Sequence, residues 1–219
     1  MKKLESSLKN MLLVLTAVTG VSVALLAYVN ELTKEPIAQA NAKTLNEALK
    51  SVVPAFVNNP VAECDTIFSE KDGKKIVDFI IYPAKNGEEI VGTAVEAKSM
   101  GFGGELKILV GFDADGKIYN YSLLAHAETP GLGSKAADWF KEGNKGSIKG
   151  LNPGEKQLAV SKDGGQIDAI TASTITSRAF LNAVNAAYSA YKGNTQNGDT
   201  NDTTGATQHV EYTDSVSAN

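Results

Sequence analysis

The sequence has very few residues that bind metals or form disulfides. Its 219 residues include one cysteine, Cys64, and two histidines, His126 and His209. A single thiol excludes an internal disulfide and an all-cysteine iron–sulfur site within the chain. Two histidines disfavour a multi-histidine metal centre. We therefore expect Cys64 to be a free thiol, and an organic cofactor is favoured if this chain carries a redox centre of its own.

The sequence also lacks an excess of positive charge. Lysine and arginine total 21 against 25 aspartate and glutamate, which gives a formal net charge of −4. A nucleic-acid-binding protein would present a basic face, so this class is disfavoured. The length allows one or two domains with a sizeable hydrophobic core.

Apolar residues are concentrated near the N-terminus. No charged side chain occurs between Lys9 and Glu31, and about 20 apolar residues span the hydrocarbon core of a membrane as a helix. A cleaved signal peptide would have a shorter apolar region and a small-residue cleavage site, which does not follow here. A buried core helix is the remaining alternative. The pattern favours an uncleaved, single transmembrane anchor in the inner (cytoplasmic) membrane.

The charges that flank this segment predict its orientation. Lys2, Lys3 and Lys9 outweigh Glu5 before the span, so we expect a cytoplasmic N-terminus and a main domain on the extracytoplasmic, periplasmic side. The last residues are polar and lack an apolar face, which is typical of disorder. We divide the chain into a cytoplasmic N-terminus (1–9), a transmembrane helix (10–30), a stalk or helical linker (31–66), a main domain (67–192) and a disordered tail (193–219).

The main domain mixes strand and helix patterns, which predicts an α+β fold with an antiparallel sheet and flanking helices. Asp113–Lys117 is a tight connection, so the runs on either side of it should form a hairpin. Gly193 is a natural helix stop. The predicted strands are 76–82, 90–97, 106–112 and 118–124. The predicted helices are 36–53, which could continue the membrane helix, 134–141 and 177–192.

Two glycine-containing loops are candidates for ligand binding. Gly101–Gly104 precedes a strand, and its glycines allow either a turn or a close backbone approach to a ligand. The order of elements does not match a dinucleotide-binding fingerprint. His126–Lys135 follows a strand and precedes a helix, a position that suits an anionic or heteroaromatic ligand. A well-capped connection with a structural His126 is the simpler alternative.

A third candidate is the hydroxyl-rich segment 168–179. Five threonine or serine hydroxyls fall within seven residues at the start of the last predicted helix. Thr176 or Ser177 would cap that helix, but one cap does not require five hydroxyls. Clustered hydroxyls and free N–H groups at a helix start also suit a phosphate, which Arg178 would neutralise.

Taken together, the three segments resemble the FMN-binding domain family. In that family a membrane-anchored extracytoplasmic domain carries FMN, esterified through its phosphate to a threonine in a Ser/Thr-Gly-Ala-Thr/Ser motif. The aligned run here is Thr171-Ala172-Ser173-Thr174, so the resemblance assigns the covalent FMN to Thr174, as a phosphoprotein-type linkage. Ala172 replaces the usual glycine and Ser173 the usual alanine. Thr176 is the alternative acceptor.

The resemblance also implies the rest of the flavin site. The remaining cofactor-binding residues expected by analogy are Glu128, Thr129, Gly131, Leu132, Gly133, Lys135, Asp168, Thr171, Ser173 and Ser177, with no metal ligand and no catalytic residue. A separate Mg-dependent flavin transferase makes the phosphoester in the family. We expect that transferase and the membrane to be partners of this chain.

Length, the single anchor and motif spacing are similar to the G subunits of Rnf ion-translocating complexes, which couple electron flow between ferredoxin and NAD to ion transport. The resemblance implies an electron-relay subunit that is not catalytic alone and that contacts the other membrane and peripheral subunits. The C subunit of a Na⁺-translocating NADH:quinone reductase, which is usually longer, is the alternative. A flavin-free, membrane-tethered binding or scaffold module is an alternative of another class.

Overall fold

The computed structural model describes residues 8–71 and 74–198, and the fold is α+β, as the sequence predicts. The described chain divides into two units, one up to Leu45 and one from Asn46 onward. The elements are α1 (Leu8–Val52), β1 (Asp65–Lys71), β2 (Lys74–Asn86), β3 (Glu89–Met100), β4 (Glu105–Asp113), β5 (Ile118–Ala125), η1 (Gly133–Lys135), α2 (Ala136–Trp139), η2 (Ser161–Asp163) and α3 (Thr174–Gly198).

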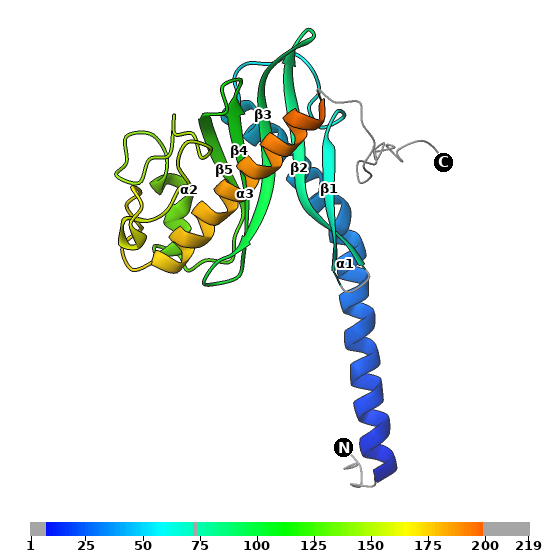
Figure 1. Ribbon diagram of the computed structural model, residues 1–219. Helices are drawn as coiled ribbons and strands as arrows, with labels where there is room; N and C mark the ends of the chain where they lie inside the picture. The colour runs from blue at the N-terminus through cyan, green and yellow to red at the C-terminus, as the bar shows by residue number, and fades with distance from the viewer. Residues whose placement is uncertain (1–7, 72–73, 199–219) are drawn as a thin grey trace. The chain divides into compact units, whose positions relative to one another are not determined.

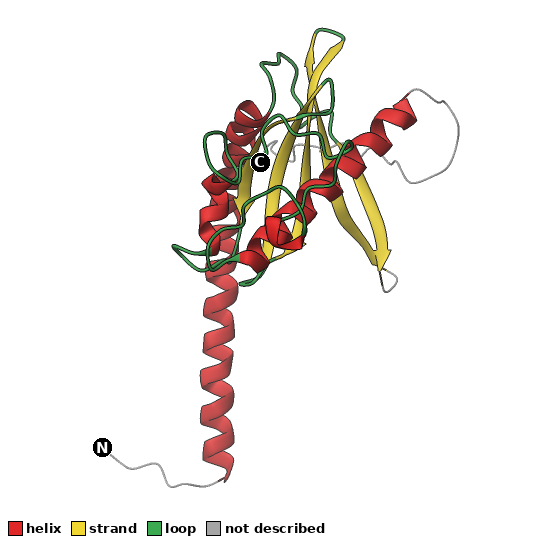
Figure 2. Ribbon diagram, turned by 60° about the vertical axis from the view of Figure 1, so that its left-hand side comes forward, coloured by secondary structure: helices red, strands yellow, loops and turns green. Residues whose placement is uncertain are grey.

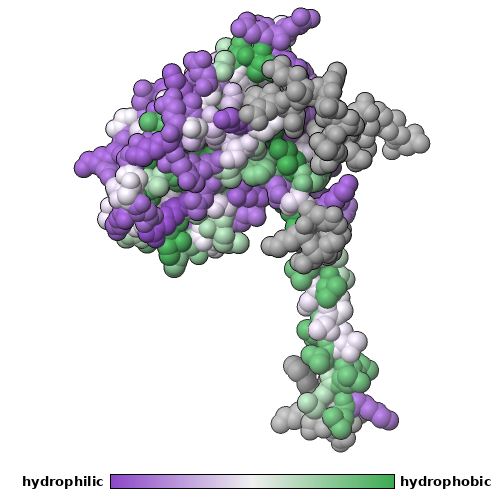
Figure 3. Space-filling view, in the orientation of Figure 1, coloured by the Kyte–Doolittle hydropathy of each residue, from purple (hydrophilic) through white to green (hydrophobic). Residues whose placement is uncertain are grey.

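The first unit consists of the N-terminal part of α1. Its apolar residues are exposed along the helix (Figure 3), and the most apolar stretch has a mean hydropathy of 2.3. It is the one helix in the described part of the chain that is long and apolar enough to cross a membrane. The helix continues through Pro36 to Val52, so the predicted anchor and the predicted helix 36–53 form one continuous helix.

The second unit is built on an antiparallel sheet, drawn in yellow in Figure 2. The sheet has five strands in the order β1-β2-β3-β4-β5. The predicted hairpin between β4 and β5 is confirmed, with Val110 opposite Tyr121. All four predicted strands are present, and β2 and β3 extend beyond their predicted ends. The first strand, β1, was not among the predicted strands.

Helix α3 covers one face of this sheet (Figure 1). Val95, Ile108 and Val110 of the central strands form a buried core with Phe180 and Val184 of α3. Stacked rings strengthen this core, since Phe140 lies parallel to Phe180 with a centroid separation of 4.2 Å. The core therefore fixes α3, and the loop before it, relative to the ends of the strands.

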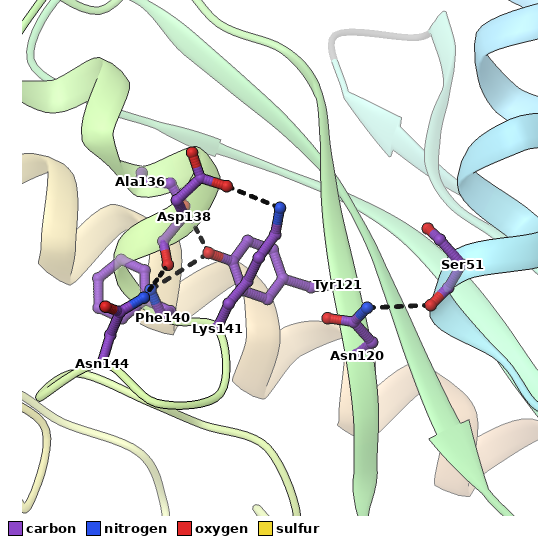
Figure 4. Close-up of polar contacts among 8 residues, drawn as sticks. All are labelled: Ser51, Asn120, Tyr121, Ala136, Asp138, Phe140, Lys141 and Asn144. Atoms are coloured by element: carbon purple, nitrogen blue, oxygen red, sulfur yellow. Dashed lines mark hydrogen bonds and ion pairs between the residues drawn. The ribbon is translucent and has the colours of Figure 1, made fainter.

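The opposite face of the sheet carries small residues where the last turns of α1 pack. Gly111 lies against the carbonyl group of Val52, which leaves no room for a Cβ atom. The side chain of Asn120 donates a hydrogen bond of 2.9 Å to the carbonyl oxygen of Ser51 (Figure 4). The last residues of α1 thus belong to the sheet domain.

Tyr121 on β5 anchors α2. Its buried hydroxyl donates to the carbonyl oxygen of Ala136 at 2.7 Å and accepts from the N–H of Phe140 at 3.2 Å (Figure 4). Burial raises the pKa of this phenol well above its usual range. Since the Tyr121 side chain lies in the sheet core, it ties the connection after β5 to the sheet.

Several predicted element ends were wrong. The helix predicted over 134–141 is a 3₁₀ turn, η1, followed by the short α2. Helix α3 begins at Thr174 rather than Ser177, so neither Thr176 nor Ser177 is its N-cap, and it continues through Gly193 to Gly198. The remainder of the predicted tail, 199–219, and residues 1–7 lie outside the described residues. The predicted domain boundaries otherwise stay predictions.

Candidate functional site

Glu128 brings together the three segments that the sequence singled out. Its side chain is 5% exposed. One carboxylate oxygen, Oε1, accepts the backbone N–H of Gly103 at 3.1 Å, and Oε2 accepts the hydroxyl of Thr176 at 2.7 Å. The β3–β4 turn, the loop after β5 and the start of α3 therefore meet at one buried carboxylate.

Three glycines make room for this arrangement. A Cβ atom on Gly101 would overlap Oε1 of Glu128, and one on Gly133 would overlap Oε2. A Cβ atom on Gly103 would overlap the backbone carbonyl oxygen of Ala127. Since any side chain at these positions would displace Glu128 or the backbone beside it, the glycines serve close packing here rather than turning alone.

The loop after β5 is held by its own hydrogen bonds. His126 Nδ1 accepts the N–H of Glu128 at 3.2 Å. The carbonyl oxygen of Thr129 accepts the N–H groups of Leu132 and Ser134, and the hydroxyl of Ser134 accepts the N–H of Gly131 at 2.9 Å. The loop thus has a defined shape, with Gly131 at a φ of 76°.

The first turn of α3 exposes one hydroxyl and buries two. Ser177 is fully buried, where its hydroxyl accepts from the N–H of Ile170 and donates to the carbonyl oxygen of Ser173. Thr176 is 1% exposed and bonded to Glu128. Thr174 is half-buried, and no side-chain partner for its hydroxyl is found in the described part of the chain.

Ala172 adopts a backbone conformation that favours glycine. Its φ is 63°, and it is the only non-glycine residue with a positive φ in the described ranges 8–71 and 74–198. A left-handed conformation costs an L-residue about 1–2 kcal/mol. The position where the resembled motif has glycine is therefore a position where the backbone needs one, and the turn persists with alanine.

Four large apolar residues that adjoin this cluster in the sequence are exposed. Each is a direct sequence neighbour of a residue that lies against Glu128. They are Met100, Phe102, Leu132 and Ile175, which are 72%, 70%, 42% and 53% exposed. Exposed apolar side chains gathered at one place are typical of a binding surface.

The structure does not bring every predicted site residue to Glu128. The carboxylate of Asp168 faces Ser161 at 3.4 Å, and its carbonyl oxygen accepts the indole N–H of Trp139 at 2.7 Å. Lys135 and Thr171 are exposed, and neither side chain has a polar partner in the described part of the chain. Arg178, which the sequence offered as a phosphate partner, forms a two-point ion pair with Asp163.

Two contributors to the site were missed in the sequence. Phe102 was part of a glycine-rich segment, yet its ring is exposed beside the cluster. The sequence predicts Thr176 as a cap or an alternative acceptor, whereas its hydroxyl is the partner of Glu128. The aromatic residue between two glycines could have indicated Phe102, but no signal in the sequence links Thr176 to a residue 48 positions earlier.

The residues fit a phosphate-bearing heteroaromatic ligand. A free hydroxyl lies on the first helical turn at Thr174, where N–H groups favour a phosphate. Exposed apolar side chains offer contact area to a planar ring. Together with the antiparallel sheet and the N-terminal apolar helix, this site has the features of the membrane-anchored FMN-binding domain proteins that the sequence resembles.

Comparisons with known proteins agree with this class. The FMN-binding domain model matches residues 101–189, and the model of the RnfG N-terminal region matches residues 1–52. The G subunit of the ion-translocating oxidoreductase complex of Cereibacter sphaeroides is 34% identical over 75% of each chain. The corresponding proteins of Yersinia pestis and Shewanella loihica are 35% and 36% identical over 73% and 74% of this chain, and 78% of their own lengths. The chain belongs to the family of these G subunits.

Proposed function

We propose that this chain carries FMN as the G subunit of an Rnf-type ion-translocating oxidoreductase complex and relays electrons within it. The family assignment and the FMN-binding domain support this function. The observation that carries it in the structure is the convergence of the three motifs at Glu128 beside the free hydroxyl of Thr174. The match to the RnfG N-terminal region favours this complex over the related quinone reductase.

The FMN is proposed to be covalent, with its phosphate esterified to Thr174. The Thr174 hydroxyl would attack the diphosphate of FAD, forming an O–P bond while AMP leaves and the hydroxyl proton is lost. A separate flavin transferase would provide the catalysis, so this chain needs no catalytic base of its own and must present the Thr174 hydroxyl to that enzyme. The partial exposure of Thr174, against the burial of Thr176, supports Thr174 as the acceptor.

The residues around Thr174 have distinct proposed roles. When bound, FMN supplies the electron-accepting and electron-donating chemistry. The N–H groups at the start of α3 would stabilise the charge of the phosphate. Leu132 and Phe102 would shield the ring from water, and the Glu128 cluster would hold the three segments in place. Asp168, Lys135 and Thr171 are exposed at the periphery of the site. They would contact the transferase there.

The attachment is tested by expressing the full chain together with a flavin transferase. After denaturation and electrophoresis, the chain should fluoresce under ultraviolet light. Thr174→Ala should abolish this fluorescence, and Thr174→Ser should retain it because serine keeps the hydroxyl. A denatured chain that does not fluoresce would contradict covalent attachment, and a native chain that carries no flavin would favour a flavin-free binding module. Fluorescence that persists in Thr174→Ala would contradict the assignment of the acceptor.

The N-terminus is proposed to lie in the cytoplasm and the FMN-binding domain outside it. The apolar helix supports a single-pass anchor in a membrane complex, and the lysines before it support the orientation. Single-cysteine variants in a Cys64→Ser background test this in spheroplasts with a membrane-impermeant maleimide. Lys156→Cys should be labelled in intact spheroplasts, and Lys3→Cys only after lysis. The reverse pattern would contradict the orientation.

A further inference from the structure

We propose that Glu128 is a positioning residue for the modification of Thr174 and acts through Thr176. This inference rests on the proposed function, because it concerns the presentation of the attachment site. Glu128 is joined to the start of α3 by the 2.7 Å hydrogen bond from Thr176, and to the β3–β4 turn by the 3.1 Å bond from Gly103. It therefore links the helix that carries Thr174 to the sheet.

Helix geometry turns this link into a constraint on Thr174. Successive residues of an α-helix are rotated by about 100°, so residues two apart point to nearly opposite sides. Thr176 points inward to Glu128, so Thr174 must point outward. Their burial agrees, since Thr176 is 1% exposed and Thr174 is only half-buried.

The hydroxyl of Ser177 also holds the first turn of α3 against the body of the domain. Ser177 is held by the N–H of Ile170 and the carbonyl oxygen of Ser173. Two side chains of the first turn are thus fixed on the sheet side. The first turn is also rich in β-branched residues, which are poor helix formers. External contacts must therefore hold this turn in helical form, and the Glu128 contact joins the turn to the loop after β5.

Glu128 performs this role through hydrogen bonds rather than through an ion pair. Its carboxylate has no lysine or arginine partner in the described part of the chain. A glutamine of the same shape can accept the Gly103 N–H and donate its amide N–H to the Thr176 oxygen, because a hydroxyl both donates and accepts. Glu128→Gln therefore removes the charge and keeps the link, whereas Glu128→Ala removes both.

The test measures the rate of flavin attachment to the purified full chain in detergent, with FAD and the flavin transferase as reactants. Glu128→Ala and Thr176→Val should each react about ten- to a hundredfold more slowly, because the hydroxyl of Thr174 is no longer held in one direction. The loss should be in kcat, with KM for FAD unchanged. Glu128→Gln and Thr176→Ser should recover most of the rate.

A control and a second measurement separate positioning from general instability. Ser189→Ala removes a comparable side-chain hydrogen bond, to Asn185, on an exposed part of α3, and should react at the original rate. Hydrogen exchange of the Gly103 amide in the apo chain should become faster in Glu128→Ala but not in Glu128→Gln. This measurement does not depend on the flavin.

Different outcomes would contradict the positioning role of Glu128 and the attachment of flavin to Thr174. If Thr174→Ala abolishes attachment while Glu128→Ala and Thr176→Val react normally, the positioning role is overturned and the attachment site stands. If Glu128→Gln is as slow as Glu128→Ala, the charge rather than the hydrogen-bonded link is required, and the inference is again overturned. If Thr174→Ala still takes up flavin, the proposed attachment site itself is wrong.

Discussion

The carboxylate of Glu128 and the hydroxyl of Thr176 are joined by a hydrogen bond of 2.7 Å, although 48 residues separate them in the chain. This contact joins the loop after β5 to the first turn of α3. A hydrogen bond to a buried carboxylate is stronger than one between neutral groups. The geometry around Thr174 therefore exists only in the folded domain, where the sheet places the loop after β5 beside the first turn of α3.

Ala172→Gly should stabilise the domain. Alanine at a φ of 63° is strained, and glycine removes that strain while adding some entropy to the unfolded chain. We expect a net gain of about 1 kcal/mol in the free energy of unfolding. Chemical denaturation of the apo full chain in detergent measures this gain. The unfolding is followed by the fluorescence of Trp139, the sole tryptophan.

The control is Ala55→Gly, at an exposed loop position without a positive φ. This variant should instead lose stability by about 0.5–1 kcal/mol. Equal losses in both variants would contradict strain at Ala172.

Gly103→Ala should disrupt the site from the side of the β3–β4 turn. The new Cβ atom would overlap a backbone oxygen, that of Ala127, so the turn must shift and the bond from the Gly103 N–H to Glu128 must lengthen. Overpacking of this kind costs about 1–3 kcal/mol in the free energy of unfolding, and attachment of flavin should slow in parallel.

Gly193→Ala is the matched control, because nothing lies within 4 Å of its Cβ position. It should not destabilise the chain, since alanine favours a helix by up to about 1 kcal/mol. A neutral Gly103→Ala in the same denaturation assay would show that the turn is not tightly packed.

The sequence predicted the sheet better than it predicted the site. Alternating apolar residues and tight turns located β2 to β5, whereas β1 (Asp65–Lys71) carries too many polar and charged residues to stand out. The start of α3 was placed three residues late, because Thr174 and Thr176 are poor helix formers and were interpreted as part of a capping segment. Tertiary contact with Glu128 overrides that weak local preference. Gly193 was interpreted as a stop, but a glycine ends a helix when it adopts a left-handed conformation, and Gly193 has no positive φ.

The ion pair between Asp163 and Arg178 predicts a pH dependence of stability. Hydrogen bonding to Arg178 lowers the pKa of Asp163 below its usual value. A lowered pKa in the folded state means that the pair stabilises the fold above the unfolded pKa, about 3.9, and that this contribution disappears as the pH falls through the folded value. The difference in Tm between the original chain and Asp163→Asn should therefore be largest near neutral pH and vanish in acid.

The effect should be modest, because the Arg178 and Asp163 side chains are 47% and 39% exposed and exposed ion pairs contribute little. Asp115→Asn is the control, since Asp115 is exposed and has no ion-pair partner in the described ranges. It should show no such pH-dependent difference in Tm. A difference between Asp163→Asn and the original chain that persists unchanged below the folded pKa would contradict the role of the pair.

Phe102→Ala should open the flavin to solvent without preventing its attachment. The ring of Phe102 is 70% exposed and lies between two glycines that pack against the loop containing Glu128, so it is available to cover a planar ligand beside Thr174. Aromatic contacts of this kind contribute about 0.5–1.5 kcal/mol.

Iodide quenching of flavin fluorescence in the native, flavin-loaded chain tests this prediction. Quenching should increase in Phe102→Ala, while the fluorescence of the denatured chain stays the same because Thr174 is intact. Tyr119→Ala removes another exposed aromatic side chain, at the opposite end of β5, and should leave quenching unchanged. Equal quenching in Phe102→Ala and the original chain would show that Phe102 does not shield the flavin.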